Sequence, residues 1–579
     1  MKSKKLLATV LSAVITFSAV SAVSAAPVGK ESKSEPKTTT IFWENNTHNT
    51  RKSTTGITQE KFNKFQDITK FFEKNISKFG VKKGSLKNTK VVKDDKGKTN
   101  YHMIYQVDDI PVYYGRIVFT TKKDSSIDSI TGKIDATFEN DSWKNKVKLS
   151  KDNAIEKAKD SIKHDSLSKT NATLYLYNFE GKPYVAYLVN LITDNGDWNI
   201  FVNAENGSIV NQFNNTPTLV ENKDENLPNA EEIKKASQEP ANINNVINVN
   251  GQAAKGQGKT TLDGIVDIDL TYKDGKYYLK DSNKNIYLYD LNHSSIATYT
   301  RFKDRILRRS TLVENNSNKF TEDKHVTAVD GYVNLSKTYD YYKNKFNRNS
   351  IDNKGMNVEG FIHTGENFNN AFWRDDIGSM FFGDGDGKLF SSFASSLDVV
   401  GHELSHGITS KESKLKYEKE SGALNESFSD IMGVAIEGKN FQIGEDCYTP
   451  NIPGDALRDM EDPSKGGQPA HMKDFKNLPN NKDNDWGGVH TNSGIINHAA
   501  YLIAVGMEKS GESNSKDIMA NLFYKANCNY WDEITDFAKC RNDVVKVAKD
   551  LYGENSKHVK IVENAFDQVG ITATPQLPL

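Results

Sequence analysis

Three residues in the middle of this chain, His402, Glu403 and His406, have the types and spacing for joint chemistry. They form the pattern H-E-x-x-H in a stretch with helical character, and residues four apart share one face of a helix. Both imidazoles could therefore reach one metal ion, with the Glu403 carboxylate beside them to handle the proton of a bound water. This is the ligand pattern of a zinc hydrolase, which still needs a third protein ligand.

A second helical segment, residues 422–430, offers that ligand. Glu426 and Asp430 lie four apart, so both carboxylates lie on one helical face. Glu426 could bind the metal, and Asp430 could accept a hydrogen bond from a ligating imidazole and fix its tautomer. The connection between the two segments, residues 407–425, is long enough to turn one helix back against the other.

A third cluster runs from Asp485 to His490. Its glycines, Gly487 and Gly488, permit a tight turn that could present His490 into a cleft, with Asp485 orienting the imidazole. A histidine near the metal would donate to the oxyanion that forms when water attacks a carbonyl group. We interpret the other histidines, including His363, His471 and His498, as structural or surface residues.

Taken in this order, the three clusters resemble the thermolysin family of neutral metalloproteases. The resemblance covers roughly residues 245–573, and the upstream region resembles the propeptide of the same family. Further stretches agree with it: Asn370-Ala371-Phe372-Trp373, Gly383-Asp384-Gly385-Asp386-Gly387, Ile443-Gly444-Glu445-Asp446 and Tyr448-Thr449-Pro450.

The resemblance implies a role for each clustered residue. The implied zinc ligands are His402, His406 and Glu426, with Asp430 supporting His402. Glu403 is implied as the general base that activates the zinc-bound water and passes the proton to the leaving amine. His490 and Tyr417 are implied to stabilise the oxyanion, and Asp485 to orient His490.

The resemblance also implies how a peptide is held. Asn370 and Ala371 would bind the substrate backbone, and Arg458 would contact the carbonyl beside the scissile bond. An apolar pocket would receive the residue after that bond, so we expect cleavage on the N-terminal side of large hydrophobic residues. The pocket residues are Phe390, Phe393, Val399, Ile443 and Leu457, with Cys447 nearby.

Calcium is the second implied cofactor, because carboxylate clusters supply the oxygen ligands that it takes. One implied site contains Asp398, Glu437 and Glu445, and we expect a single ion there because Asn440 and Gln442 stand where a two-ion site would want carboxylates. A second site is implied at Tyr448, Thr449, Ile452 and Asp455. Residues 315–319 lack carboxylates, so we expect no ion there. We interpret the run Gly383–Gly387 as a turn.

These residues require an α+β fold to position them. We expect a thermolysin-like two-lobed catalytic domain, with a β-rich N-terminal lobe, a mainly α-helical C-terminal lobe and the zinc helix at the cleft, preceded by an α+β antiparallel-sheet propeptide. The expected divisions are a signal peptide (1–25), an FTP-like propeptide segment (26–90) that begins with a flexible leader, a PepSY-like domain (91–215), a linker with the maturation cleavage region (216–242), the β-rich lobe (243–400) and the helical lobe (401–579).

The amino-terminal segment predicts that the protein is exported from the cell. The first residues carry a basic segment, an apolar run from Leu6 to Val20 and the small-residue site Val23-Ser24-Ala25, which is typical of a secretory signal. A net charge of -1 gives no basic field for nucleic acid, and no later segment is apolar enough to anchor in a membrane. Of the three cysteines, Cys528 and Cys540 could pair, or all three could be free.

The sequence therefore predicts an exported zinc metalloendopeptidase that acts on proteins and peptides, is inhibited or folded by its own propeptide, and is a monomer when mature. An inactive binding protein would lack at least one ligand or Glu403, and none is missing. A zinc aminopeptidase would need acidic groups before the zinc helix to anchor a free amino terminus, and we find no such motif. Composition leaves open whether the two halves separate by cleavage or stay joined.

Overall fold

The computed structural model describes residues 41–45, 50–54, 60–94, 96–162, 164, 167–193, 196–220, 249–294, 303, 306–307 and 310–572. The expected signal peptide and most of the expected linker, residues 221–242, lie outside these ranges. Within them, no helix combines the length and apolar character needed to cross a bilayer.

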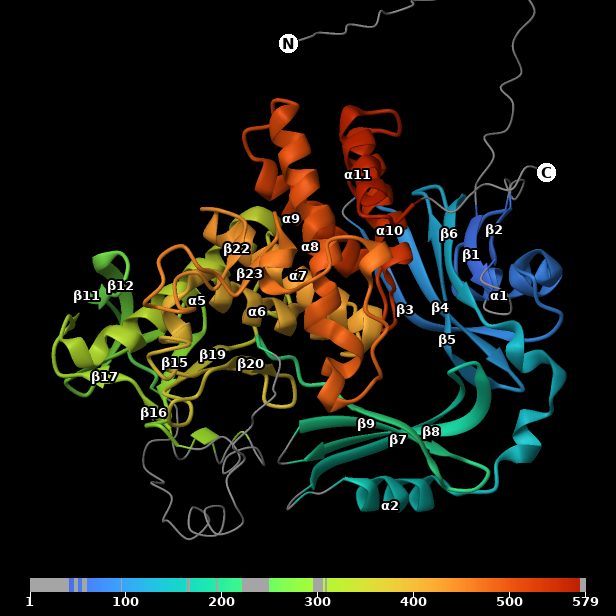
Figure 1. Cartoon of the computed structure of the whole chain (residues 1–579), viewed down its shortest axis with the longest axis horizontal. Helices are drawn as coiled ribbons and strands as arrows, with labels where there is room; N and C mark the ends of the chain where they lie inside the picture. Colours follow the sequence, from blue (N-terminus) through green and yellow to red (C-terminus); the bar gives the residue numbers. More distant parts are fainter. Residues whose placement is uncertain are drawn as a thin grey trace, which may run out of the picture.

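A ten-stranded sheet forms the N-terminal half of the chain (Figure 1). Its main path runs β10-β9-β8-β7-β5-β6-β1-β2, and β3 joins it through β4, which pairs with β5. The strands are β1 (Ile41–Asn45), β2 (Thr50–Thr54), β3 (Ser85–Lys93), β4 (Thr99–Val107), β5 (Ile110–Thr121), β6 (Ile127–Ile134), β7 (Leu167–Phe179), β8 (Lys182–Thr193), β9 (Gly196–Asn203) and β10 (Ile209–Asn214).

Two helices accompany this sheet, α1 (Phe65–Lys74) and α2 (Lys151–Ser161). The helical spacing in the sequence predicts α1, whose residues Ile68, Phe71 and Phe72 are buried. Strands β4 and β5 pair in an antiparallel hairpin. The expectation of a flexible leader up to residue 58 is wrong for β1 and β2, because the strand-prone run Ile41–Trp43 lies within that polar stretch and pairs in parallel with β6.

Two smaller sheets form the β-rich lobe, as expected. One has the order β17-β13-β12-β11-β18, and the other β14-β15-β19-β21-β20 with β16 beside β15. The strands are β11 (Gln252–Thr260), β12 (Gly264–Lys273), β13 (Lys276–Tyr278), β14 (Lys280–Asp281), β15 (Ile286–Asp290), β16 (Thr311–Leu312), β17 (Glu314–Asn315), β18 (Lys319–Phe320), β19 (Val358–Ile362), β20 (Ala371–Arg374) and β21 (Ser379–Phe382).

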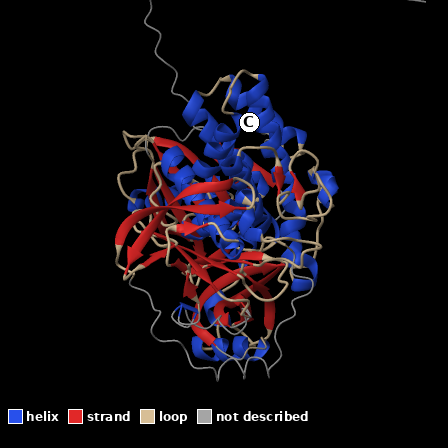
Figure 2. Cartoon of the chain, turned by 90° about the vertical axis from the view of Figure 1, so that its left-hand side faces the viewer, coloured by secondary structure: helices blue, strands red, loops and turns tan. Residues whose placement is uncertain are grey.

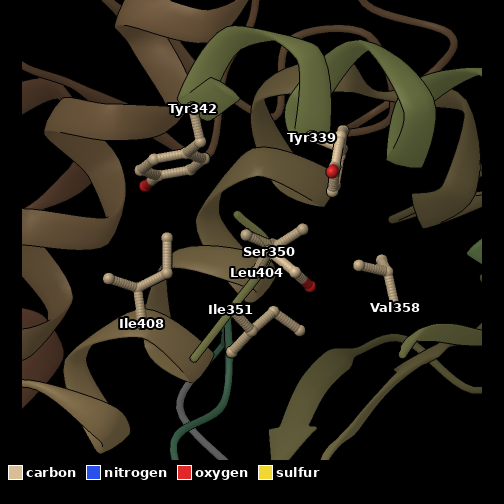
Figure 3. A pocket seen from close by; sticks show the side chains of 7 residues that line it. All are labelled: Tyr339, Tyr342, Ser350, Ile351, Val358, Leu404 and Ile408. Atoms are coloured by element: carbon tan, nitrogen blue, oxygen red, sulfur yellow. The ribbon is translucent and has the colours of Figure 1, made fainter. Parts of the chain in front are cut away.

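One long helix in this lobe, α5 (Val326–Phe346), was not predicted. Its valines, threonines and tyrosines have high strand propensity, which hid the helical spacing of the buried residues Val329, Tyr332, Leu335 and Tyr342. Between α5 and the zinc-motif helix lies a small, mostly apolar cavity (Figure 3), lined by Tyr339, Tyr342, Ser350, Ile351, Val358, Leu404 and Ile408.

The C-terminal lobe is mainly helical, which confirms the predicted α+β class (Figure 2). Its helices are α6 (Leu397–Lys411), α7 (Lys419–Glu437), α8 (Asp485–Lys509), α9 (Ser515–Asn529), α10 (Phe537–Tyr552) and α11 (Lys557–Gln568), and its short strands β22 (Gln442–Ile443) and β23 (Arg458–Asp459) pair with each other. The backbones of α6 and α7 lie so close that a Cβ atom on Gly433 would be 2.6 Å from the Asp398 carbonyl oxygen.

The N-terminal half docks on the helical lobe through charged and aromatic contacts. Lys98 lies 2.6 Å from Asp550, and Lys546 lies 2.6 Å from Asp128. The rings of Trp198 and Trp486 pack edge to face at 5.7 Å between centroids. All three cysteines are free, so the pair Cys528–Cys540, which the sequence left open, does not form.

Candidate active site

The H-E-x-x-H motif lies on α6, and Glu426 faces it from α7. One ligand atom from each of His402, His406 and Glu426 lies within 4.8 Å of the others, and all three residues are buried. The two Nε2 atoms are 2.9 Å apart, and Glu426 Oε1 is 3.3 Å from His406 Nε2. The structure thus brings together the three residues that the sequence grouped as metal ligands.

Hydrogen bonds at the Nδ1 atoms fix the orientation of the two imidazole rings. His402 Nδ1 lies 2.8 Å from Asp430 Oδ1, and His406 Nδ1 lies 2.9 Å from Asn425 Oδ1. With Nδ1 engaged, each ring presents Nε2 to the centre of the cluster. Burial, followed by the neighbouring His406, lowers the pKa of His402 to about 4, so the ring is neutral, as a metal ligand must be.

The cluster also contains oxygens that fit a cation. Glu426 Oε2 and both carboxylate oxygens of Glu403 are buried and have no hydrogen-bond partner among the described residues. Although burial alone would raise it, the nearby His490 and His406 lower the pKa of Glu426 to about 2. Burial and then the charge of Glu426 raise the pKa of Glu403 well above its ordinary value. Two imidazoles and one carboxylate form a ligand set that suits zinc.

Tyr417 and His490 lie beside this cluster. Asp485 Oδ1 is 2.7 Å from His490 Nδ1, and Tyr417 Oη is 3.1 Å from His490 Nε2. The backbone leaves helical geometry at Trp486, Gly487 and Gly488, the turn that the glycines predicted. Burial would lower the pKa of His490, but Asp485 and then Glu426 raise it to about 10, so the ring is a charged donor at neutral pH.

A segment of the chain itself, Thr218-Leu219-Val220, lies between these residues and β20. It follows the ten-stranded sheet and runs antiparallel to β20, where Thr218 pairs with Phe372. The Leu219 N–H donates to the Ala371 carbonyl at 3.0 Å. The Asn370 side chain accepts from the Val220 N–H at 3.1 Å and donates to the Val220 carbonyl at 3.2 Å.

The carbonyl groups of the segment face the predicted site residues. The Thr218 oxygen is 2.5 Å from His490 Nε2 and accepts from Tyr417 Oη at 3.3 Å. Arg458 donates to the Leu219 oxygen at 2.7 Å while it pairs with both oxygens of Asp430. The sequence analysis did not predict this occupant; the signal that could have found it is the apolar pair Leu219-Val220 in a polar stretch.

Leu219 is fully buried in the same apolar core cluster as the predicted pocket residues. Leu457 is partly buried and packs against that cluster. The other pocket residues in the cluster are Phe390, Phe393, Val399 and Ile443, together with Cys447.

The first predicted calcium site is a cluster of acidic residues in which Asp398 is buried and Glu437 and Glu445 are partly buried. Burial and the charge of Glu445 raise the pKa of Asp398 to about 7, and burial and Asp398 raise the pKa of Glu437 to about 8. Glu445 Oε2 has no hydrogen-bond partner among the described residues. A cation would relieve the mutual repulsion of these carboxylates. Lys439 lies 2.9 Å from Glu437 and 2.8 Å from Asp446.

The second predicted calcium site forms a loop after α7. Thr449 Oγ1 donates to Asp455 Oδ2 at 2.8 Å, and the Ile452 N–H donates to the Thr449 carbonyl at 2.7 Å. Tyr448, the fourth predicted residue, pairs with Phe390 in an isolated bridge.

Comparison with known families gives matches along most of the chain. Residues 255–410 match the thermolysin metallopeptidase catalytic domain, and residues 413–571 match the thermolysin metallopeptidase alpha-helical domain. Residues 84–134 match the fungalysin/thermolysin propeptide motif, and residues 148–213 match the peptidase propeptide and YPEB domain.

Named relatives match over similar lengths. The chain is 36% identical to bacillolysin from Bacillus cereus over 504 residues, which cover 84% of this chain and 85% of the relative. It is 32% identical to neutral protease B from Bacillus subtilis (strain 168), covering 87% and 89%. It is 34% identical to thermolysin from Alicyclobacillus acidocaldarius subsp. acidocaldarius, covering 83% and 84%.

Proposed function

Because the chain belongs to the thermolysin family of metallopeptidases, we propose that it is a secreted zinc endopeptidase, made as a zymogen, that cuts on the N-terminal side of large hydrophobic residues. The observation that carries this proposal is the segment Thr218–Val220: its Thr218 carbonyl contacts His490 and Tyr417, and its Leu219 is buried in the same apolar core as the predicted pocket residues. Secretion is supported by the basic and apolar segments at the start of the chain.

In this proposal His402, His406 and Glu426 hold the zinc ion. A bound zinc ion supplies Lewis acidity at the scissile carbonyl group. Asp430 keeps the His402 ring in place through Nδ1, and Asn425 does the same for His406. The buried, unpartnered Glu426 Oε2 fits a ligand atom, because a buried oxygen without a partner is costly.

Glu403 moves the proton. Its carboxylate accepts a proton from the attacking water and passes it to the nitrogen of the leaving amine. Burial and then Glu426 raise the pKa of Glu403, and the positive charge of a bound zinc ion would favour the ionised form that accepts the proton. No described residue hydrogen-bonds to its carboxylate, so both oxygens are free to take the proton.

Tyr417 and His490 stabilise the oxygen of the attacked carbonyl group. Both already contact the Thr218 oxygen in the zymogen, at 3.3 and 2.5 Å. Asp485 keeps His490 charged and fixes its ring through Nδ1. Donors aimed at this oxygen favour the developing negative charge of the transition state over the neutral substrate.

The same contacts indicate which bond the enzyme cuts first in itself. Because the Thr218 carbonyl lies at the proposed oxyanion donors and the buried Leu219 follows it, the first bond proposed to be cut is Thr218–Leu219. Until that bond is cut, the propeptide fills the cleft and acts as an intramolecular inhibitor. The mature enzyme is proposed to be a monomer that acts on protein and peptide substrates.

Two structural calcium ions complete the proposal. One is bound by Asp398, Glu437 and Glu445. A single ion is favoured there because the Lys439 ammonium group already neutralises Glu437 and Asp446. The other is bound in the loop of Tyr448, Thr449, Ile452 and Asp455, whose carboxylate and exposed position suit a hydrated ion.

The experiment is a time course of self-processing with amino-terminal sequencing of each fragment. The first new amino terminus is expected to be Leu219, and Glu403→Gln is expected to remain full length. Leu219→Asp places a charge in the apolar pocket and should slow this cut at least about tenfold. Leu262→Asp, at an exposed leucine, is the matched control. A first cut at another bond, unchanged in Leu219→Asp, would contradict the proposal.

A further inference from the structure

Three residues outside the cleft meet at one edge of the six-stranded sheet. Strand β19 runs parallel to β15 on one side and to β21 on the other, so their carboxyl ends share an edge. The chain leaving these three ends carries His293, His363 and Asp384, which are far apart in the sequence. Parallel strands thus assemble a cluster that no local sequence pattern contains.

Both imidazoles of this cluster face the same carboxylate. His363 Nδ1 lies 2.8 Å from Asp384 Oδ2, and His293 Nδ1 lies 3.3 Å from the same oxygen. One ligand atom from each residue lies within 4.8 Å of the others. The second oxygen, Asp384 Oδ1, is buried and has no hydrogen-bond partner among the described residues. Hydrogen bonding within the cluster therefore leaves one carboxylate oxygen unused.

The backbone holds the two histidines in place. The His293 N–H donates to the His363 carbonyl at 2.8 Å, and the Gly365 N–H donates to the Ser294 carbonyl at 3.0 Å. Both histidines have left-handed backbone conformations, with φ of 59° and 51°, which are uncommon for residues other than glycine. The His293 side chain is 48% exposed, so an ion from solvent can reach the cluster.

We propose that His293, His363 and Asp384 bind a divalent transition-metal ion at a site separate from the catalytic cluster. Two imidazoles and one carboxylate suit Zn²⁺ and its neighbours in the first transition series, with water completing the coordination. Calcium and magnesium do not fit, because they prefer oxygen ligands. An ion here would also give the unused Asp384 oxygen a partner.

The position of this site gives the ion a mechanical role. Asp384 lies between Gly383, whose N–H donates to the Asn370 carbonyl at 3.0 Å, and Gly385, whose N–H donates to the Phe368 carbonyl at 3.2 Å. Asn370 in turn holds Val220 in the cleft. The ion therefore connects the loop around Asp384 to the ends of β15 and β19. That loop supports the edge of β20 that binds the peptide.

The test measures metal stoichiometry in the full-length Glu403→Gln protein, which keeps its propeptide. The protein is freed of transition metals, kept in calcium, titrated with Zn²⁺ and analysed for bound zinc by mass spectrometry. We expect two zinc ions per chain, one ion in His293→Ala and one in Asp384→Asn. His558→Ala is the matched control, because His558 also pairs with a carboxylate, that of Glu512 at 2.9 Å, but with no second histidine in its cluster; it should bind two.

Two ions in both His293→Ala and Asp384→Asn would overturn the proposal, as would one ion in the parent. Melting curves give an independent reading: the rise in melting temperature on adding Zn²⁺ should shrink in both variants. His402→Ala separates this inference from the peptidase proposal. The His402→Ala variant should lose the catalytic ion and keep the ion at the second site. If the parent protein binds a single ion and His402→Ala binds none, only the second site is refuted.

Discussion

The two walls of the cleft are built differently and do different work. The helical wall, made by α6, α7 and the start of α8, carries Glu403, Glu426 and His490. The strand wall is the free edge of β20, and it touches the bound segment through Ala371 and Asn370. The helical wall presents side chains to the Thr218 carbonyl, whereas the strand wall mainly presents hydrogen-bonding groups to the peptide backbone.

This difference separates catalysis from binding. Donors and a base that act on the reacting atoms interact more strongly with the transition state, so their loss lowers kcat. Hydrogen bonds to the backbone away from the scissile bond are equal in the ground and transition states, so their loss raises KM. The following substitutions test whether the two walls divide in this way.

Loss of the base on the helical wall should have the largest effect. Glu403→Gln keeps the size of the side chain but cannot accept the proton from water. We expect kcat for casein or a peptide substrate to fall about 10⁴-fold, at the upper end for a general base. Because this variant cannot process itself, it is assayed after the propeptide is removed by an added protease. Glu508→Gln, at an exposed position on α8, is the control.

An oxyanion donor on the same wall should have the next largest effect. His490→Ala removes the donor at 2.5 Å from the Thr218 oxygen while Tyr417 remains. We expect kcat to fall about 10²–10³-fold with KM nearly unchanged. Steady-state kinetics on a peptide with leucine after the scissile bond separate the two constants. A change confined to KM would place His490 in binding and would remove the distinction between the walls.

The strand wall should show the opposite pattern. Asn370→Ala removes the side chain that makes two hydrogen bonds to Val220, which are worth together about 1–2 kcal/mol. We expect KM to rise about tenfold with kcat nearly unchanged. Asn369→Ala is the matched control, because Asn369 bonds to Asp386 at 3.1 Å. A fall in kcat with constant KM would contradict the assignment of Asn370 to binding.

The helical wall was also easier to predict from sequence than the strand wall. The ligands lie at positions i and i+4, so His402 and His406 reveal their shared face without knowledge of the fold. The clusters at Glu426 and His490 could be assigned to the site because they follow the H-E-x-x-H motif in the order that the family resemblance requires. The strand wall depends on which strand forms the edge of a sheet, and that is set by pairings between distant residues.

The elements that sequence reasoning missed all depend on such distant contacts. Helix α5 has strand-prone residues whose helical form is stabilised by packing between the sheets and α6. Strand β1 exists because β6 pairs with it. Leu219 is an unremarkable apolar residue in a polar stretch until the fold buries it in the apolar core. The cluster of His293, His363 and Asp384 likewise forms only when three strands align.

The smallest expected effect is a change in zymogen stability caused by Asp197 on β9. The charges that act on this carboxylate belong to residues near both walls. Burial raises its pKa to about 6; Lys416, beside the helical wall, opposes this, while Asp376 and Asp375, after β20, add to it. Because the unfolded carboxyl has the ordinary pKa of 3.8, the folded zymogen binds this proton more tightly. Stability is therefore lost as pH rises from about 4 to about 6, and the full cost remains above pH 6.

Asp197→Asn removes that cost, so it should stabilise the Glu403→Gln zymogen at pH 8 and have little effect near pH 4. Two pKa units set an upper limit of about 3 kcal/mol, and partial exposure of Asp197 reduces the expected gain to about 1 kcal/mol. Melting temperatures at the two pH values measure it, with Asp160→Asn, an exposed carboxylate on α2, as the control. An equal gain at both pH values would mean that the substitution acts through packing, and the charge at the junction of the two walls would then have no part in holding the propeptide.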